Sequence, residues 1–233
     1  MGKIKIYISA SNQDYNRSTG QPTVESEQCG IISDKEAELL RATGRFEVKV
    51  GKMDGMYAKI AEANAWGADL YTCNHTNAGG GNGSRLFYYT EGGEGQLVCQ
   101  AIAKYLFPLS PGPDDRIKRN DLLETREPKA PCAYAEIEFH DNAEGAAWIV
   151  AHPDQIAEAL AHGICDHYGV AWGFSTAPAP TPAPAPAEGE KIRHRVMVDA
   201  QRQGSYADKA KAEAVVQQLK ALNVTAHIET VTL

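Results

Sequence analysis

The chain has 233 residues, of which 43% are hydrophobic and 23% charged, as expected for a soluble globular domain of ordinary size with an appendage. Its net charge of −7 argues against a nucleic-acid-binding protein, which would need clustered Lys and Arg to neutralise phosphates. The longest basic run, at 116–119, is short enough to be a solvated loop. No apolar run approaches membrane-spanning length, so no membrane insertion is expected.

The cysteines and the N-terminus indicate where the chain is made. The five cysteines include no CxxC pair, so neither a disulfide framework nor a structural zinc knuckle is indicated, and buried thiols in a reducing compartment are expected. Residues 4–8 alternate like a strand and directly follow the first three residues, with no apolar segment of signal-peptide length. We therefore expect synthesis in the cytoplasm without a signal peptide.

Short strand-like runs alternate with helical stretches through residues 1–175. The predicted strands are 3–9, 46–50, 70–74, 84–89 and 133–138, and the predicted helices are 25–43, 56–66, 95–106, 144–151 and 153–168. This alternation predicts an α/β fold with a central, twisted, mainly parallel sheet flanked by helices. Functional side chains in such a sheet gather beyond the carboxyl ends of the strands.

The remaining residues divide into a spacer and a small module. Residues 176–187 read TAPAPTPAPAPA, and an Ala/Pro-rich linker over 176–190 should be extended and semi-rigid. Residues 191–233 predict a small α+β module, with a strand at 193–200, a helix at 206–222 and a strand at 225–231. The expected domains are thus 1–175 and 191–233, joined by the linker.

Four side chains from separate elements are expected at one edge of the sheet. Glu25 opens the first helix, His75 follows the third predicted strand, Glu136 lies on the last strand and His140 follows it. Each has an ordinary explanation alone: a His at a strand end is often structural, and Glu25 suits the first turn of a helix. Together they offer the nitrogen and oxygen donors that a catalytic zinc needs.

These segments resemble a known enzyme family. The matching residues are KIYISASNQ (5–13), ESEQC (25–29), ANAWGADLYTCNHTNA (63–78), GSRLFYY (83–89) and AYAEIEFHD (133–141). They resemble the type-3 zinc N-acetylmuramoyl-L-alanine amidases, most closely the variant of clostridial phage endolysins and prophage-like wall hydrolases. The likeness covers residues 3 to about 169, with the motifs in order and at family-like intervals.

The resemblance implies hydrolysis of the amide between N-acetylmuramic acid and L-alanine, with Glu25 and His75 as ligands of Zn²⁺ and Glu136 as the catalytic glutamate. The chain departs from the family at Asn12, where most members have a histidine ligand after the first strand. His140 could supply the missing nitrogen, Asn12 or Gln13 could orient a water or the substrate, or the domain could bind without metal. The expected zinc ligands are therefore Glu25, His75 and His140.

Two further segments suggest contacts with the substrate. The glycine-rich stretch 77–84 lacks the GK[ST] sequence of a phosphate-binding loop, so we interpret it as a loop beside His75 that lines the substrate cleft, with Asn77 in contact. Arg126 lies in a long polar segment and could bind carboxylates of the stem peptide, although a plain surface loop is the alternative.

The C-terminal module resembles SPOR domains, which bind peptidoglycan glycan strands. The match is carried by residues 195–206, 211–224 and 225–231, and it includes one of the two halves that such domains usually contain. A stabilising or dimerising appendage is the alternative. A wall-binding module on a tether suits an enzyme that acts on an insoluble polymer.

The sequence thus predicts a peptidoglycan hydrolase, acting as a phage or prophage endolysin that reaches the cell wall after holin-type release or lysis. Two alternatives stay open. The first is a non-catalytic cell-wall-binding protein with the amidase fold. The second is a zinc peptidase that cuts within the stem peptide.

Overall fold

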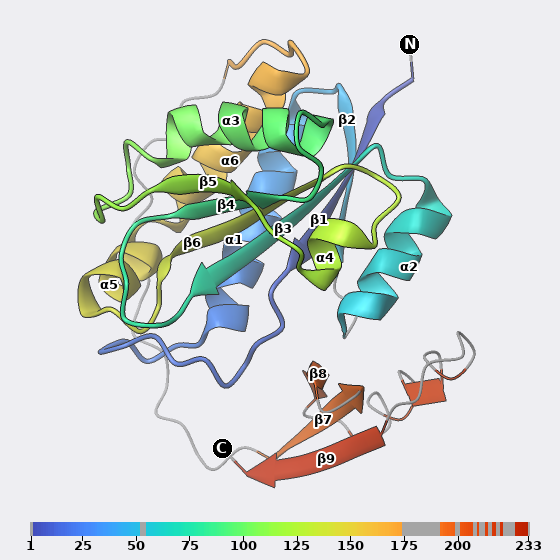
Figure 1. Ribbon diagram of the computed structural model, residues 1–233, viewed down its shortest axis with the longest axis vertical. Helices are drawn as coiled ribbons and strands as arrows, with labels where there is room; N and C mark the ends of the chain where they lie inside the picture. The colour runs from blue at the N-terminus through green and yellow to red at the C-terminus, as the bar shows by residue number, and fades with distance from the viewer. Residues whose placement is uncertain are drawn as a thin grey trace.

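The computed structural model describes residues 2–51, 55–173, 192–198, 201–206, 209, 213, 216, 217, 220 and 227–232. Within residues 2–173, six strands form one sheet in the order β2-β1-β3-β6-β4-β5 (Figure 1). These strands are β1 (Ile4–Ala10), β2 (Phe46–Gly51), β3 (Leu70–Asn77), β4 (Arg85–Tyr88), β5 (Arg116–Arg119) and β6 (Cys132–Phe139). Every neighbouring pair is parallel except β4 and β6, which confirms the predicted mainly parallel sheet.

Helices cover both faces of this sheet. They are α1 (Glu25–Ala42), α2 (Met56–Trp66), α3 (Glu94–Leu106), α4 (Leu123–Arg126), α5 (Ala143–Ala151) and α6 (Pro153–His167). Alternate strand residues such as Ile6 and Ile8 pack with α1, α3 and α6 in the larger core cluster. Tyr7, Tyr71 and Tyr134 point to the other face and pack with α2 and the start of α4. All five cysteines are buried free thiols, as predicted.

The polar segment before β6 contains two elements that the sequence did not predict. Residues 116–119 form the edge strand β5 instead of a loop, and residues 123–126 form the single turn α4. β5 has no apolar alternation because it lies at the sheet edge and most of its side chains face solvent. The sequence pattern does not predict α4, because four residues are too few to show helical periodicity.

The C-terminal module contains a second, antiparallel sheet with the order β8-β7-β9. Its strands are β7 (Ile192–Val198), β8 (Gln201–Tyr206) and β9 (His227–Thr232). The first and last match predicted strands, whereas β8 occupies residues 201–206, where only the start of the helix was expected. Residues 209, 213, 216, 217 and 220 are helical, as predicted. The predicted linker lies outside the described residues.

Within the part of the chain that the structure describes, no helix is both long and apolar enough to cross a membrane.

Candidate active site

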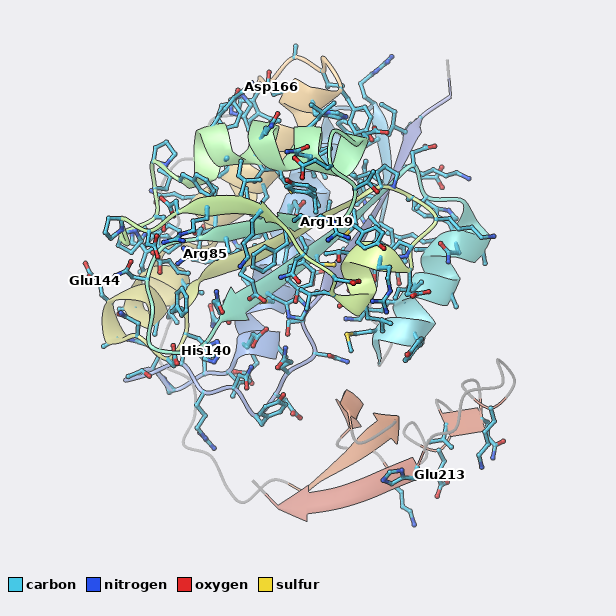
Figure 2. All side chains as sticks on the ribbon, in the orientation of Figure 1. Arg85, Arg119, His140, Glu144, Asp166 and Glu213 are labelled. Atoms are coloured by element: carbon cyan, nitrogen blue, oxygen red, sulfur yellow. The ribbon has the colours of Figure 1, made fainter. Side chains whose placement is uncertain are left out.

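The carboxyl ends of β1, β3 and β6 meet at one edge of the large sheet. The loop between β1 and α1 is tied across this edge, because Ser11 N donates to Asn74 O at 2.9 Å and Thr19 N donates to His140 O at 2.8 Å. Figure 2 shows His140 at this edge beside that N-terminal loop. The convergence predicted from the sequence is therefore present.

Glu25 lies at the centre of the predicted cluster, at the first position of α1. Its Oε1 is 3.0 Å from His75 Nδ1, and its Oε2 accepts a hydrogen bond of 2.6 Å from Asn16 Nδ2. Burial raises the pKa of Glu25, but the hydrogen bonds and charge of its neighbours outweigh burial and hold the pKa below its usual value. Glu25 is therefore an ionised carboxylate held against an imidazole.

A bulge in β6 brings His140 to the same carboxylate. His75 pairs with Glu136, but Asn77 pairs with Phe139, so β6 contains one extra residue between these pairs. Glu138 lies in this bulge with a φ of 52°. The extra residue reverses the alternation of side chains, so His140 faces the α1 side, where its Nδ1 lies 3.8 Å from Glu25 Oε2.

The imidazole of His140 contacts Thr76 of β3. Its Nδ1 is 2.9 Å from Thr76 Oγ1 and 3.3 Å from Thr76 O. Both His75 and His140 are nearly inaccessible to solvent, with 4% of each residue exposed. The two imidazoles therefore approach one buried carboxylate from different strands.

Glu136 provides a carboxyl group beside this cluster. Its backbone is directly paired with His75 across β3 and β6, and its Oε2 is buried without a hydrogen-bond partner among the described residues. Burial raises the pKa of Glu136 to about 7, with Glu25 adding to the rise and His75 opposing it. A carboxyl group with such a pKa can both accept and donate a proton near neutral pH.

The structure adds Glu124, which the sequence did not single out. It lies on α4, only 1% exposed, and its Oε2 is 3.6 Å from His75 Nε2. Burial would raise the pKa of Glu124, but His75 and the buried Lys59 lower it to about 2. The adjacent apolar residues Leu122 and Leu123 could have indicated a buried turn in this otherwise polar segment.

His75 is thus enclosed by negative charge. Burial alone would lower its pKa, but Glu124, Glu25 and Glu136 together raise the pKa to about 10. The ring stacks on Tyr134 with 4.8 Å between centroids, which fixes the plane in which its two nitrogens lie. Such surroundings favour positive charge at this position, carried by the imidazolium itself when no ion is bound.

The three residues predicted to bind substrate occupy different positions. Asn12 is half-buried in the loop after β1, next to Gln13, whose Nε2 is 3.4 Å from His75 Nδ1. Asn77 ends β3, and its backbone oxygen accepts from His140 N at 2.9 Å. Arg126 is exposed on α4 and forms ion pairs with Asp121 and Glu127 at 2.6 and 2.9 Å. Asn12 and Asn77 therefore adjoin the cluster, whereas the guanidinium of Arg126 binds neighbours in its own segment.

The donor atoms have a spacing compatible with zinc, although they are not assembled into a complete site. In the described residues, no group of three or more His, Cys, Asp or Glu side chains is arranged to hold a metal ion as it stands. Two ligands at ~2.1 Å from a tetrahedral ion lie roughly 3.4 Å apart. The 3.0 Å between His75 and Glu25 and the 3.8 Å between His140 and Glu25 bracket this value. Glu25 with either histidine therefore has a spacing suited to two zinc ligands, and a set of three would require His140 to exchange its contact with Thr76.

The family model Amidase_3, described as N-acetylmuramoyl-L-alanine amidase, matches residues 9–166. No curated protein sequence matches the chain.

Three solved structures illustrate the similarity of fold. The catalytic domain of CwlV, an N-acetylmuramoyl-L-alanine amidase from Bacillus (Paenibacillus) polymyxa var. colistinus, has a TM-score of 0.64 at 17% identity and covers 72% of this chain and 99% of its own. An N-acetylmuramoyl-L-alanine amidase from Clostridium difficile 630 has a TM-score of 0.62 at 21% identity, covering 72% and 98%. The catalytic domain of the CD27L endolysin, which targets Clostridia Difficile, has a TM-score of 0.57 at 20% identity, covering 70% and 97%.

Proposed function

Because this chain belongs to the N-acetylmuramoyl-L-alanine amidase family, we propose that it uses zinc to hydrolyse the amide between N-acetylmuramic acid and L-alanine in peptidoglycan. The observation that carries the proposal is the pair of imidazoles, His75 and His140, that approach the Glu25 carboxylate at 3.0 and 3.8 Å. Glu136, with a buried carboxylate oxygen that has no hydrogen-bond partner, lies beside them.

In this proposal Glu25, His75 and His140 hold the ion. Glu25 and His75 need little movement, whereas His140 must exchange its contact with Thr76 for the metal. When bound, zinc polarises the amide carbonyl and lowers the pKa of water, which matters because an amide is a poor electrophile. The histidine that most family members carry after the first strand is thereby replaced by His140, which follows β6 on the other side of β3.

Glu136 acts as the general base and then as the general acid. Its carboxylate accepts a proton from the attacking water and passes that proton to the leaving nitrogen of L-alanine. Burial raises the pKa of this carboxyl group above its usual value, which strengthens it as a proton acceptor.

The glycine-rich loop after β3 is proposed to contact the sugar–peptide substrate, with Asn77 at its base and Asn12 on the opposite side. This loop is held in place by Asp141, whose Oδ2 accepts from Gly79 N at 2.6 Å and Gly80 N at 2.9 Å. Arg126 could bind a carboxylate of the stem peptide if that carboxylate displaced one of the two acidic neighbours.

The biological setting is also a proposal. The CD27L catalytic domain, an endolysin, shares the fold, and this supports a phage or prophage endolysin that reaches the wall after holin-type release or lysis. The module at 191–233 is proposed to bind glycan strands, as its resemblance to SPOR domains suggests. The described part of this module contains an antiparallel sheet of three strands, one strand more than the predicted strand–helix–strand unit.

The test combines metal analysis with product analysis. Purified full-length protein, Glu136→Gln and His140→Ala are each assayed for bound zinc and for new L-alanine amino termini released from purified peptidoglycan. We expect about one zinc per wild-type chain, full zinc with no release in Glu136→Gln, and loss of both in His140→Ala. The matched controls are Glu144→Gln, at an exposed glutamate of α5, and His152→Ala, at a histidine outside the cluster; both should behave as wild type.

The outcomes separate the alternatives. Zinc retained in His140→Ala would remove His140 from the ligand set while leaving the enzyme intact. New amino termini other than L-alanine would indicate a peptidase acting within the stem peptide. Absence of both zinc and released amines, with binding to sedimented walls preserved, would identify a non-catalytic wall-binding protein.

A further inference from the structure

Glu124 is a buried carboxylate with an unusually complete set of partners. Its Oε1 accepts hydrogen bonds from Ser9 Oγ at 2.5 Å and from Tyr71 Oη at 2.7 Å, which anchor it to β1 and β3. Lys59, itself 2% exposed, interacts electrostatically with the same carboxylate and donates to Ala10 O. These contacts leave Oε2 directed at His75 Nε2, 3.6 Å away.

The two nitrogens of His75 therefore face two different carboxylates. Nδ1 faces Glu25, the proposed metal ligand, and Nε2 faces Glu124. The ring is stacked on Tyr134, and both carboxylates are buried. A neutral imidazole has one donor nitrogen and one acceptor nitrogen, so the group facing Nε2 decides what Nδ1 can do.

We propose that Glu124 is a positioning residue that keeps the proton of His75 on Nε2, so that the lone pair of Nδ1 is available to the ion held with Glu25. This inference rests on the proposed zinc-dependent function and deepens it. Histidine ligands of metals commonly donate their other ring N–H to a carboxylate, which orients the ring and makes it a better donor. Glu124 Oε2 lies 3.6 Å from His75 Nε2, a buried nitrogen without a hydrogen-bond partner among the described residues, and Ser9 of β1 and Tyr71 of β3 hold the carboxylate in that place.

A second enclosed carboxyl group shows that burial alone does not produce this arrangement. Glu36 of α1 is also 1% exposed, but it accepts its hydrogen bond from the neutral Asn74 Nδ2 at 2.6 Å. Asn74 precedes His75 in β3 but points to the opposite face of the sheet, so Glu36 does not face the imidazole. Glu36→Gln is thus a matched control for Glu124→Gln.

The substitution Glu124→Gln should place a hydrogen-bond donor opposite His75 Nε2, where the wild type has an acceptor. The amide oxygen can keep the bonds from Ser9 and Tyr71, so the NH₂ group is left facing His75 Nε2. Because an amide nitrogen can only donate, Nε2 must accept and the proton moves to Nδ1, where it competes with the ion.

The experiment measures zinc affinity by chelator competition and records long-range ¹H–¹⁵N spectra of zinc-loaded, full-length protein labelled at histidine. In the wild type we expect His75 bound through Nδ1 with a proton on Nε2. Glu124→Gln should lower zinc affinity by 10- to 100-fold, whereas Glu36→Gln at pH 7 should match the wild type in affinity and spectrum. Circular dichroism establishes that each variant is folded.

Tyr71→Phe provides a second variant in case Glu124→Gln does not fold. It removes one anchor of Glu124 and keeps the charge, so a smaller fall in zinc affinity is expected. Undiminished affinity in folded Glu124→Gln or, failing that variant, in Tyr71→Phe would overturn the inference, as would coordination of His75 through Nε2. These results would leave the zinc-dependent function intact, whereas a wild-type chain that binds no zinc would overturn both.

Discussion

Glu36 of α1 is buried between the helix and β3, where its carboxyl group meets only neutral side chains. Asn74 Nδ2 donates to Glu36 Oε2 at 2.6 Å and to Ser33 Oγ at 2.9 Å. Burial raises the pKa of Glu36 to about 8, and the hydrogen bond from Asn74 offsets only part of that rise. We predict that Glu36→Gln removes a large pH dependence of the stability of the protein, because glutamine has the same shape and cannot ionise.

The sign follows from proton binding in the two states. Between about pH 4.5 and 8, Glu36 is ionised in the unfolded chain but protonated in the folded one, so the folded state binds one more proton. The contribution of Glu36 to the free energy of unfolding is therefore complete below pH 4.5 and is lost as pH rises toward 8. One pKa unit corresponds to about 1.36 kcal/mol, so the whole loss is on the order of 5 kcal/mol as an upper bound.

The assay is urea unfolding at pH 5, 6, 7, 8 and 9 with a reducing agent present, followed by circular dichroism, for the wild type and Glu36→Gln. The free energy of unfolding of the wild type should fall relative to that of the variant from pH 5 to 8, and the difference should level off toward pH 9. Other titrating groups are common to both proteins and cancel in the difference. Parallel curves over the whole range would refute the assignment of a raised pKa to Glu36.

Three further substitutions test other parts of the fold by urea unfolding. Gly163→Ala should destabilise by about 1–3 kcal/mol, because the added methyl group would overlap the backbone of Ile102 where α6 packs on α3; an unchanged midpoint would contradict this close packing. Asn142→Ala should cost about 1 kcal/mol, since its Oδ1 caps the first turn of α5, and Asn142→Asp should retain most of that stability. Glu138→Ala should lower the free energy of unfolding by about 3 kcal/mol, because the backbone N–H groups of Gly83 and Gly112 lose a buried acceptor. A decrease below about 0.5 kcal/mol would show that water replaces the carboxylate.

Much of the fold could be predicted from residue patterns. Residues 3–9 alternate between polar and apolar side chains, and residues 133–138 are largely apolar apart from Glu136 and Glu138, as expected for strands of a sheet covered by helices. The five predicted strands and five predicted helices of residues 1–173 all occur, with ends shifted by a few residues. β5 and α4 were missed because an exposed edge strand and a single turn require no periodic apolar residues.

The predicted cluster could also be placed from the sequence, but its internal arrangement could not. Glu25, His75 and Glu136 follow from the rule that polar residues at the carboxyl ends of parallel strands meet at one edge. His140 was selected for its place four residues after Glu136, a spacing that in a regular strand puts both side chains on one face. The structure reaches a similar cluster for a different reason, since the bulge at Glu138 turns His140 toward α1 and Glu25.

The sequence by itself determined the layered α/β architecture and the set of side chains at its edge, because local periodicity and strand order depend on neighbouring residues. Only the tertiary structure decided which atom of each side chain faces which partner. Glu124 lies 49 residues from His75 in the sequence, yet its carboxylate faces His75 Nε2 because α4 packs against β6. Contacts of this kind depend on side-chain directions and packing between distant segments, which no pattern along one chain encodes.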